Sequence, residues 1–188
     1  RSTLFPYTTL FRSGGGGRSA VIGFDPSSTT AAENHTFIGD GSSKFLKVDN
    51  AGHVTMPLQS SFRADKNSTP QNNIGSSAVT VTFGTERVDT NGDYNTSTST
   101  FTAPVTGTYV LHYSIRLESI DSASSYYNVS IETSNRSYNS IFSNDEWAGD
   151  VTYWSAERTI VADMDAADTA YVSIVFIGGA AQTDISGS

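Results

Sequence analysis

The sequence has no cysteine among its 188 residues. A disulfide framework and a thiolate metal site are therefore both excluded. This absence does not decide the compartment, since disulfide-free proteins occur outside cells and on virions as well as inside cells. Long apolar runs are also missing, and none approaches the roughly 20 residues that a membrane-spanning helix requires. We therefore expect no membrane insertion.

Basic residues are few. The chain has 11 Lys and Arg against 19 Asp and Glu, which gives a formal net charge of −8. Binding to a phosphate backbone needs clustered cations. We therefore expect no nucleic acid partner.

The first residues are interpreted as foreign to the protein. Residues 4–13 read LFPYTTLFRS, which resembles one translated reading frame of a common sequencing adapter; a short apolar strand or a targeting sequence is the alternative. Residues 1–13 are thus an expected artefact, and residues 1–17, with their glycine run, are left out of fold reasoning. Removing Arg1 and Arg12 leaves 9 basic residues against 19 acidic ones, a net charge of −10.

Residues 18–61 are turn-rich and contain only short strand-like pieces. These pieces are residues 20–24, 35–38, 44–48 and 53–56. The stretch FLKVDNAGHVTMP, residues 45–57, resembles the shaft-to-head connectors of phage and marine-virus fibre proteins. We interpret residues 18–61 as a fibre-like connector, with a flexible linker or a two-stranded hairpin as the alternative.

From residue 62 onward, apolar and polar residues alternate. Residues 108–118 read TYVLHYSIRLE, with every second residue large and apolar. This period of two predicts a half-buried strand. The same alternation recurs at residues 79–83, 127–131 and 170–176, with turn signals between the runs. Many short strands joined by turns predict an all-β sandwich or jelly roll.

Several motifs in this part of the chain resemble those of complement C1q-type domains. The most specific block joins an Asn-Gly turn, a Tyr-Asn pair, a Phe-x-Ala-Pro run and a Gly-x-Tyr motif in the family's order. The residues that carry the resemblance are Phe62, Phe83, Asn91, Gly92, Tyr94, Phe101, Pro104, Gly107, Tyr109, Asp168 and Val172. The resemblance implies a tumour-necrosis-factor-like jelly roll of two antiparallel sheets over residues 62–188. It also implies a homotrimer that needs no cofactor and binds through loops at its exposed end.

Three features depart from the family pattern. Ser99 stands where a glycine often precedes the Phe101 strand, and Ala167 replaces the glycine of a Gly-Asp pair. We expect both turns to keep a negative φ, which other residues tolerate. Family members usually finish with a further strand, so we also expect a reading frame truncated in its last strand. The unpaired edges left behind would favour aggregation.

Two acidic groups are candidate metal sites. Asp89, Asn91 and Asp93 place oxygens at alternate positions, as at the start of a calcium loop. An EF-hand is excluded, because its glycine and glutamate positions hold Tyr94 and Thr100. The alternatives are a looser calcium site and an Asn-Gly hairpin turn with solvated carboxylates. A second group, made of Asp163, Asp165 and Asp168, is interpreted as a solvated loop.

Trp147 is the candidate ligand-binding residue. It lies in an acidic loop, where an aromatic ring can stack on a sugar or a protein partner. The alternative is that it packs under the loop against a neighbouring subunit.

The resemblance implies recognition without catalysis. The sequence also has no nucleophile elbow and no zinc-protease histidine spacing. We expect the receptor-binding head of a phage or virus fibre, extracellular or on the virion surface, that contacts a host-surface protein or glycan. A secreted or cell-surface adhesin and a fibre-associated glycan depolymerase are the alternatives.

Overall fold

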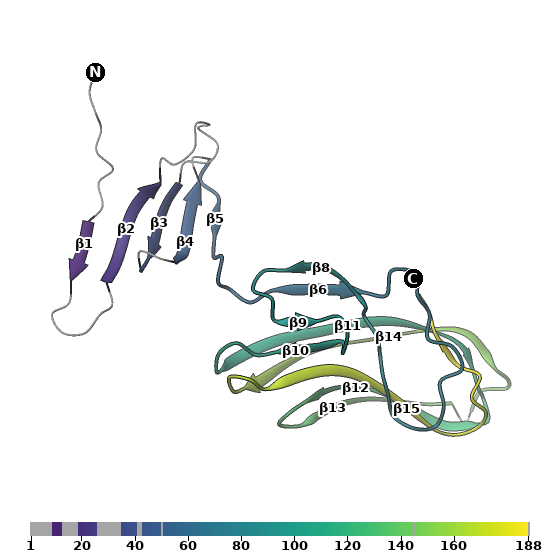
Figure 1. Ribbon diagram of the computed structural model, residues 1–188. Coiled ribbons are helices and arrows are strands. Elements are labelled where there is room, and N and C mark those ends of the chain that lie inside the picture. Colours follow the sequence, from purple (N-terminus) through teal and green to yellow (C-terminus); the bar gives the residue numbers. More distant parts are fainter. Residues whose placement is uncertain are drawn as a thin grey trace. The chain divides into compact units, whose positions relative to one another are not determined.

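The computed structural model describes residues 9–12, 19–25, 35–40, 43–49, 51–144 and 146–187. The chain divides into two compact units, Arg1–Ser60 and Ser61–Ser188. All regular elements of the described residues are strands (Figure 1). Those residues include no helix that is long and apolar enough to cross a bilayer.

The N-terminal unit is a five-stranded antiparallel sheet with its strands in sequence order. Its strands are β1 (Thr9–Arg12), β2 (Ser19–Asp25), β3 (His35–Gly39), β4 (Lys44–Asp49) and β5 (Val54–Thr55). Strands β2 to β5 coincide with the short pieces expected from the sequence. Strand β1 lies inside the segment interpreted as adapter and pairs with β2.

The C-terminal unit is built from antiparallel sheets. A six-stranded sheet has the order β13-β12-β15-β10-β9, with β7 paired to β15, and a three-stranded sheet has the order β14-β11-β16. Strands β6 and β8 form a two-stranded sheet. The strands are β6 (Phe62–Asp65), β7 (Val79–Thr80), β8 (Thr85–Asp89), β9 (Tyr94–Asn95), β10 (Thr100–Thr102), β11 (Gly107–Ile120), β12 (Ser124–Thr133), β13 (Ser137–Ser143), β14 (Val151–Met164), β15 (Thr169–Gly178) and β16 (Asp184–Ile185). The predicted all-β, jelly-roll-type sandwich is confirmed.

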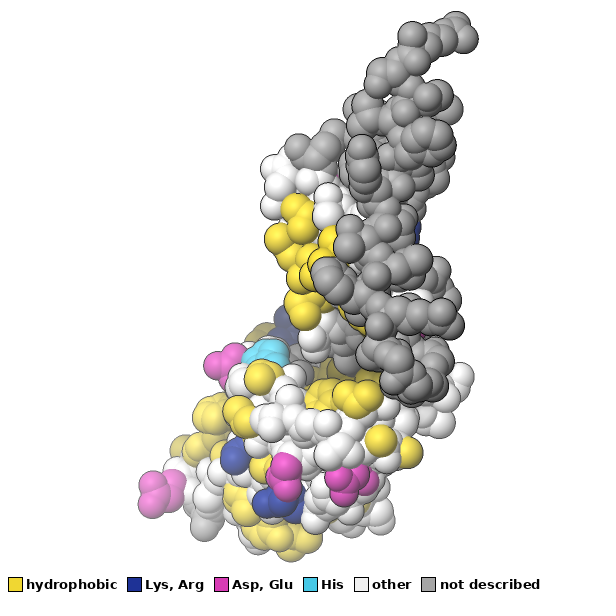
Figure 2. Space-filling model, turned by 90° about the vertical axis from the view of Figure 1, so that its left-hand side faces the viewer, with side chains coloured by type: hydrophobic (Ala, Val, Ile, Leu, Met, Phe, Trp, Pro, Cys, Tyr) yellow, Lys and Arg dark blue, Asp and Glu magenta, His cyan; other side chains and the backbone are white. Residues whose placement is uncertain are grey.

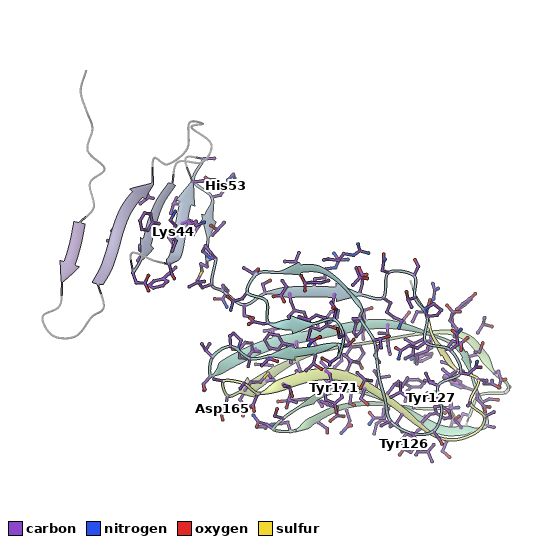
Figure 3. All side chains as sticks on the ribbon, in the orientation of Figure 1. Lys44, His53, Tyr126, Tyr127, Asp165 and Tyr171 are labelled. Carbon is purple, nitrogen blue, oxygen red and sulfur yellow. The ribbon has the colours of Figure 1, made fainter. Side chains whose placement is uncertain are left out.

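Strand β11 shows why this sequence forms a sandwich. Its inward residues, such as Leu111 and Leu117, are buried, whereas the outward Val110 is 71% exposed. The core that they join includes inward residues of β12 and β15, among them Tyr127 and Phe176. Tyr127 is fully buried between the layers (Figure 3). Burying each such side chain contributes roughly 1.5–3 kcal/mol, which offsets the entropy of ordering these long strands.

The alternation at residues 79–83 gives a shorter strand than expected. Only Val79 and Thr80 form β7, and Val81 adds one further bond, from its N–H to the Val172 carbonyl. After Val81, side chains rather than β15 form the hydrogen bonds to the backbone. The N–H of Thr82 donates to Gln71 Oε1 at 2.8 Å, and the buried Lys66 ammonium donates to the Thr82 carbonyl. The pairing with β15 therefore ends.

The expectation of negative φ at Ser99 and Ala167 was wrong. Their φ angles are +53° and +75°, in the left-handed region that favours glycine. Ala167 lies in the tight turn between β14 and β15, where its N–H donates to the Ala103 carbonyl. At Ser99 the side chain provides compensation, because its buried hydroxyl accepts the N–H of Phe83 at 2.9 Å.

Strand β16 is two residues long and pairs with β11 at Leu117 and Glu118. The further strand expected from the family pattern concerns residues beyond Ser188, and it stays a prediction.

The two left-handed residues should respond differently to glycine. Ala167→Gly is expected to stabilise the domain by about 1 kcal/mol, because it removes the clash of a Cβ at positive φ. Ser99→Gly relieves the same clash but leaves the partly buried N–H of Phe83 without its acceptor, which costs about 1 kcal/mol or more, so no gain is expected. Urea unfolding of both variants measures the difference. Equal stabilisation by both would contradict this account of Ser99.

Candidate functional site

Three loops meet at one end of the sandwich. Their described residues are 121–123, 144, 146–150 and 179–183, and they are called the apical loops below. The pairings Ile120↔Val151 and Ser124↔Gly178 bring the corresponding strand ends together. This surface is therefore a direct consequence of the antiparallel register.

Asp150, in one apical loop, accepts hydrogen bonds from the other two. Its Oδ1 accepts the N–H and the hydroxyl of Ser122, each at 2.9 Å, and its Oδ2 accepts the Gln182 amide at 2.9 Å. The Ser122 N–H, followed by the Gln182 amide and the Ser122 hydroxyl, lowers the pKa of Asp150 from its usual value. The carboxylate thus stays charged at neutral pH and cross-links the loops.

Buried polar groups beneath the surface hold the same loops. Asn144 is fully buried, and its Nδ2 donates to the Asp121 carbonyl at 2.7 Å. Its own carbonyl accepts the N–H of Trp147 at 3.0 Å. The Asp121 carboxylate accepts the N–H groups of Ala123 and Ala180, from two different apical loops. The backbone that carries Trp147 is therefore anchored to the core.

Trp147 belongs to a stack of aromatic rings that runs from the core to the surface. The fully buried Tyr127 stacks on Phe142 at 5.3 Å, and Phe142 stacks on Trp154 at 5.1 Å. Trp147 is partly buried, with its ring 6.2 Å from Phe142 and 5.3 Å from Trp154. Trp154 keeps 37% of its surface exposed. The rings thus form an aromatic surface beside the apical loops that packs on the core through Phe142 and Tyr127.

Trp147 was predicted from the sequence, whereas Phe142 and Trp154 were not. Phe142 occupies an inward position of β13, and Trp154 shares the inward parity of Ala156 on β14. The alternation along β13 and β14 could therefore have identified both residues as inward-facing from the sequence. The sequence does not show that the side chains of β13 and β14, which belong to different sheets, come into contact. The ligand-binding role of Trp147 stays a prediction.

The Asp89 turn differs from the hairpin turn with solvated carboxylates that was one alternative for it. The flanking strands β8 and β9 pair with β6 and β10, so the turn does not close a hairpin. The Asp89 carboxylate is also not simply solvated. It accepts four backbone N–H groups at 2.8–3.3 Å, those of Asn91, Gly92, Asp93 and Tyr94. Turning the chain from one sheet into another leaves these donors unpaired, and Asp89 satisfies them.

These contacts also set the charge of Asp89. Partial desolvation acts to raise its pKa, but the N–H groups of Tyr94, Asp93, Asn91 and Gly92 outweigh it and hold the pKa below its usual value. Among the described residues, no three His, Cys, Asp or Glu side chains come together in a metal-binding arrangement. Calcium binding at Asp89, Asn91 and Asp93 stays a prediction.

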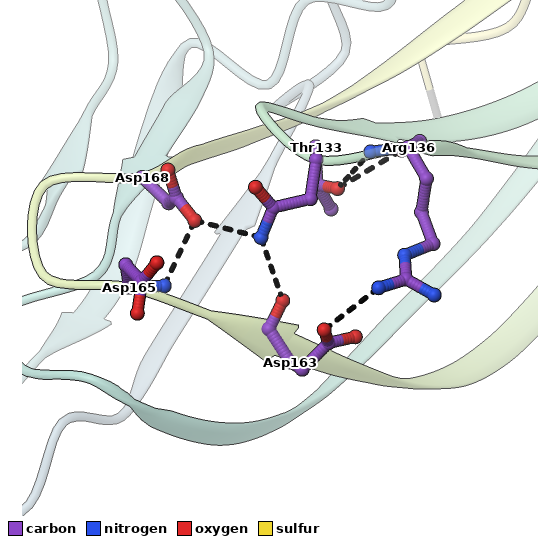
Figure 4. A network of polar contacts seen from close by, with 6 residues as sticks. Thr133, Arg136, Asp163, Asp165 and Asp168 are labelled. Atoms are coloured by element: carbon purple, nitrogen blue, oxygen red, sulfur yellow. Dashed lines mark hydrogen bonds and ion pairs between the residues drawn. The ribbon is translucent and has the colours of Figure 1, made fainter.

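The second acidic group is tied into a network that joins two turns (Figure 4). Asp163 forms an ion pair with Arg136 at 2.7 Å. Asp168 accepts the Asn135 amide at 2.9 Å and the backbone N–H of Asp165 at 2.8 Å. The network connects the β12–β13 turn to the β14–β15 turn. Asp165 lies toward the opposite end of the domain from Tyr127 (Figure 3), so this group is remote from the apical loops.

Five of the eleven motif residues form a structural cluster. Phe62 stacks between Tyr94 at 4.9 Å and Phe101 at 5.0 Å, and Phe101 contacts Tyr109 at 5.5 Å. The Tyr94 hydroxyl donates to the Phe83 carbonyl at 3.2 Å. The motif therefore marks packing between β6, β9, β10 and β11. The other motif residues are Asn91, Gly92, Pro104, Gly107, Asp168 and Val172.

Comparison with known proteins assigns the family. Residues 61–186 match the family model of the C1q domain, which is 126 of the 188 residues. The chain belongs to the C1q domain family. Domains of this family are in general non-enzymatic binding modules that form trimers, and proteins with a C1q domain are typically extracellular.

Other comparisons add little to this C1q domain assignment. No curated protein matches the sequence. Among solved structures, the globular domain of zebrafish complement 1qA protein is similar, with 16% identity and a TM-score of 0.42 over 62% of this chain and 89% of that one. An exo-β-1,3-galactanase from Phanerochaete chrysosporium shows 10% identity and a TM-score of 0.22 over 89% of this chain and 41% of that one. Neither carries an argument, because both TM-scores are low.

Proposed function

We propose that this C1q domain is the homotrimeric, non-catalytic receptor-binding head of a phage or virus tail or surface fibre. The observation that carries the proposal is the aromatic surface of Trp147 and Trp154 beside loops that Asp150 and Asn144 hold in place. A fixed surface of this kind reduces the entropy lost on binding. The N-terminal unit, whose residues 45–57 resemble a shaft-to-head connector, supports the fibre assignment.

The outward face of the β14-β11-β16 sheet is the surface that we assign to trimer formation. Val110 and Val161 lie directly opposite each other and are 71% and 64% exposed. Tyr153 lies on the same face and is 61% exposed. Neighbouring apolar side chains at such exposure favour burial against another subunit.

A glutamate on this face should prevent assembly. Val161→Glu is expected to convert a trimer into a monomer, because it would bury uncompensated charges at the interface. Ile141→Glu is the matched control, since Ile141 is 63% exposed on β13 of the other sheet and should leave the trimer intact. Light scattering after size-exclusion chromatography measures the mass. A trimer that survives Val161→Glu would contradict the assignment of this face.

The receptor is expected to be a glycan or a protein on the host surface. Aromatic rings stack on the apolar faces of sugars and of protein side chains. Lys and Arg side chains are scattered rather than gathered in one patch on the face of the described residues in Figure 2. An electrostatic, phosphate-directed mode of binding therefore has no support on that face.

Binding should depend on the aromatic surface. Glycan arrays and host-cell pull-down are expected to detect binding by the wild-type trimer and a loss of at least about tenfold in Trp147→Ala. Glu146→Lys reverses one charge in the same loop without removing a packed ring. Tyr171→Ala is the control, because Tyr171 is an aromatic residue of β15 that is 37% exposed. Equal loss in Tyr171→Ala would refute the apical site. Release of reducing ends from a bound glycan would refute the non-catalytic assignment.

A further inference from the structure

The apical loops carry negative charge and no positive charge. Lys and Arg are absent from these loops and from their flanks, over residues 117–135, 137–157 and 159–188. Glu146 and Asp150, by contrast, are both exposed there. No ion pair in the described part of the chain involves either of these two carboxylates. The loops therefore present negative charge that the chain itself does not neutralise.

The aromatic surface beside these loops contains both tryptophans of the chain. Trp147 lies in the same loop as the two exposed carboxylates, and its ring meets that of Trp154 at an angle of 43°. The face of an aromatic ring is electron-rich and attracts cations, and tryptophan does so most strongly. One surface thus combines two kinds of group that attract a positive charge.

The domain already contains this combination once. The Arg116 guanidinium lies 5.4 Å from the centre of the Tyr153 ring and forms an ion pair with Glu118 at 2.9 Å. The only Lys or Arg of β14 is Arg158, whose Nη1 donates to the Asn139 carbonyl at 2.5 Å. Neither cation forms an ion pair with an exposed carboxylate of the apical loops. Those carboxylates remain available to a cation from another molecule.

We propose that the apical aromatic surface binds a basic segment of a partner protein, with one cationic head group over Trp147 or Trp154 and another at Glu146. This inference rests on the proposed function and names the chemical class of its receptor. Complementary charge speeds the encounter and disfavours acidic partners. Rings and carboxylates at more than one position favour a segment with several cations over a single small cation.

Tryptophan fluorescence reports on this surface directly, because the chain has no tryptophan outside it. The wild-type trimer is titrated with a short blocked peptide in which lysines alternate with glycine and serine. Its emission is expected to change and to saturate. The affinity should fall when sodium chloride is raised from about 0.05 M to about 0.5 M, because salt screens exposed charges.

The matched control peptide carries acetyl-lysine at every lysine position. It has the same length and backbone but no charge on those side chains. It should bind at least about tenfold more weakly, because both the contact with the ring and the attraction to the carboxylates are lost. Tetramethylammonium chloride, titrated in the same way, is the small-cation control.

Three variants locate the binding. Glu146→Gln removes one apical charge and should weaken binding of the lysine peptide, whereas Glu86→Gln makes the same change at an exposed residue of β8 and should not. Trp147→Leu keeps apolar bulk but removes the ring, so it should also weaken binding. Melting curves check that the variants fold, and calorimetry measures their affinities.

Equal affinity for the acetylated peptide, binding without a change in tryptophan emission, or equal losses in Glu146→Gln and Glu86→Gln would overturn the proposal. Tetramethylammonium that binds as tightly as the lysine peptide would also overturn it, since a small cation would then suffice. Trp147-dependent binding of a neutral glycan without binding of the lysine peptide would overturn this inference and leave the proposed function intact. Absence of any Trp147-dependent binding would overturn both.

Discussion

The core of the domain is built on the inward face of β11, which carries Tyr113, Ile115 and Leu117. The rest of the domain packs around these side chains. The Tyr113 hydroxyl donates to the Val129 carbonyl of β12 at 3.2 Å, which ties this strand to the opposite sheet. With the inward face fixed, antiparallel pairing sets the register of β14, and that register brings the apical loops together. The arrangement of the apical loops thus depends on the alternation of residues in β11.

The loops themselves are held by polar groups rather than by packing alone. Asp150, Asp121 and Asn144 satisfy backbone donors and acceptors that would otherwise lose hydrogen bonds on folding. The aromatic stack then extends the core to the surface through Phe142. A C1q domain built in this way combines a fixed backbone with exposed rings, which is suited to binding without catalysis.

The sequence was sufficient for the fold because alternation is a local signal. It predicted β11, β12 and β15 and, through motif resemblance, the family. It failed where long-range contacts decide the outcome. The positive φ at Ala167 follows from a bond to Ala103, and the end of β7 follows from Gln71 and Lys66. For the candidate site, it identified Trp147 but not its stacking on Trp154, since that contact joins a loop to a strand across the sandwich.

The most direct measurement of the central claim is the free energy of unfolding of two variants on β11. Leu117→Ala removes a fully buried side chain and should cost about 2–5 kcal/mol. Ser114→Ala changes an exposed residue of the outward face and should change stability by no more than about 0.5 kcal/mol. Similar effects of the two substitutions would contradict a core formed by the inward face of β11.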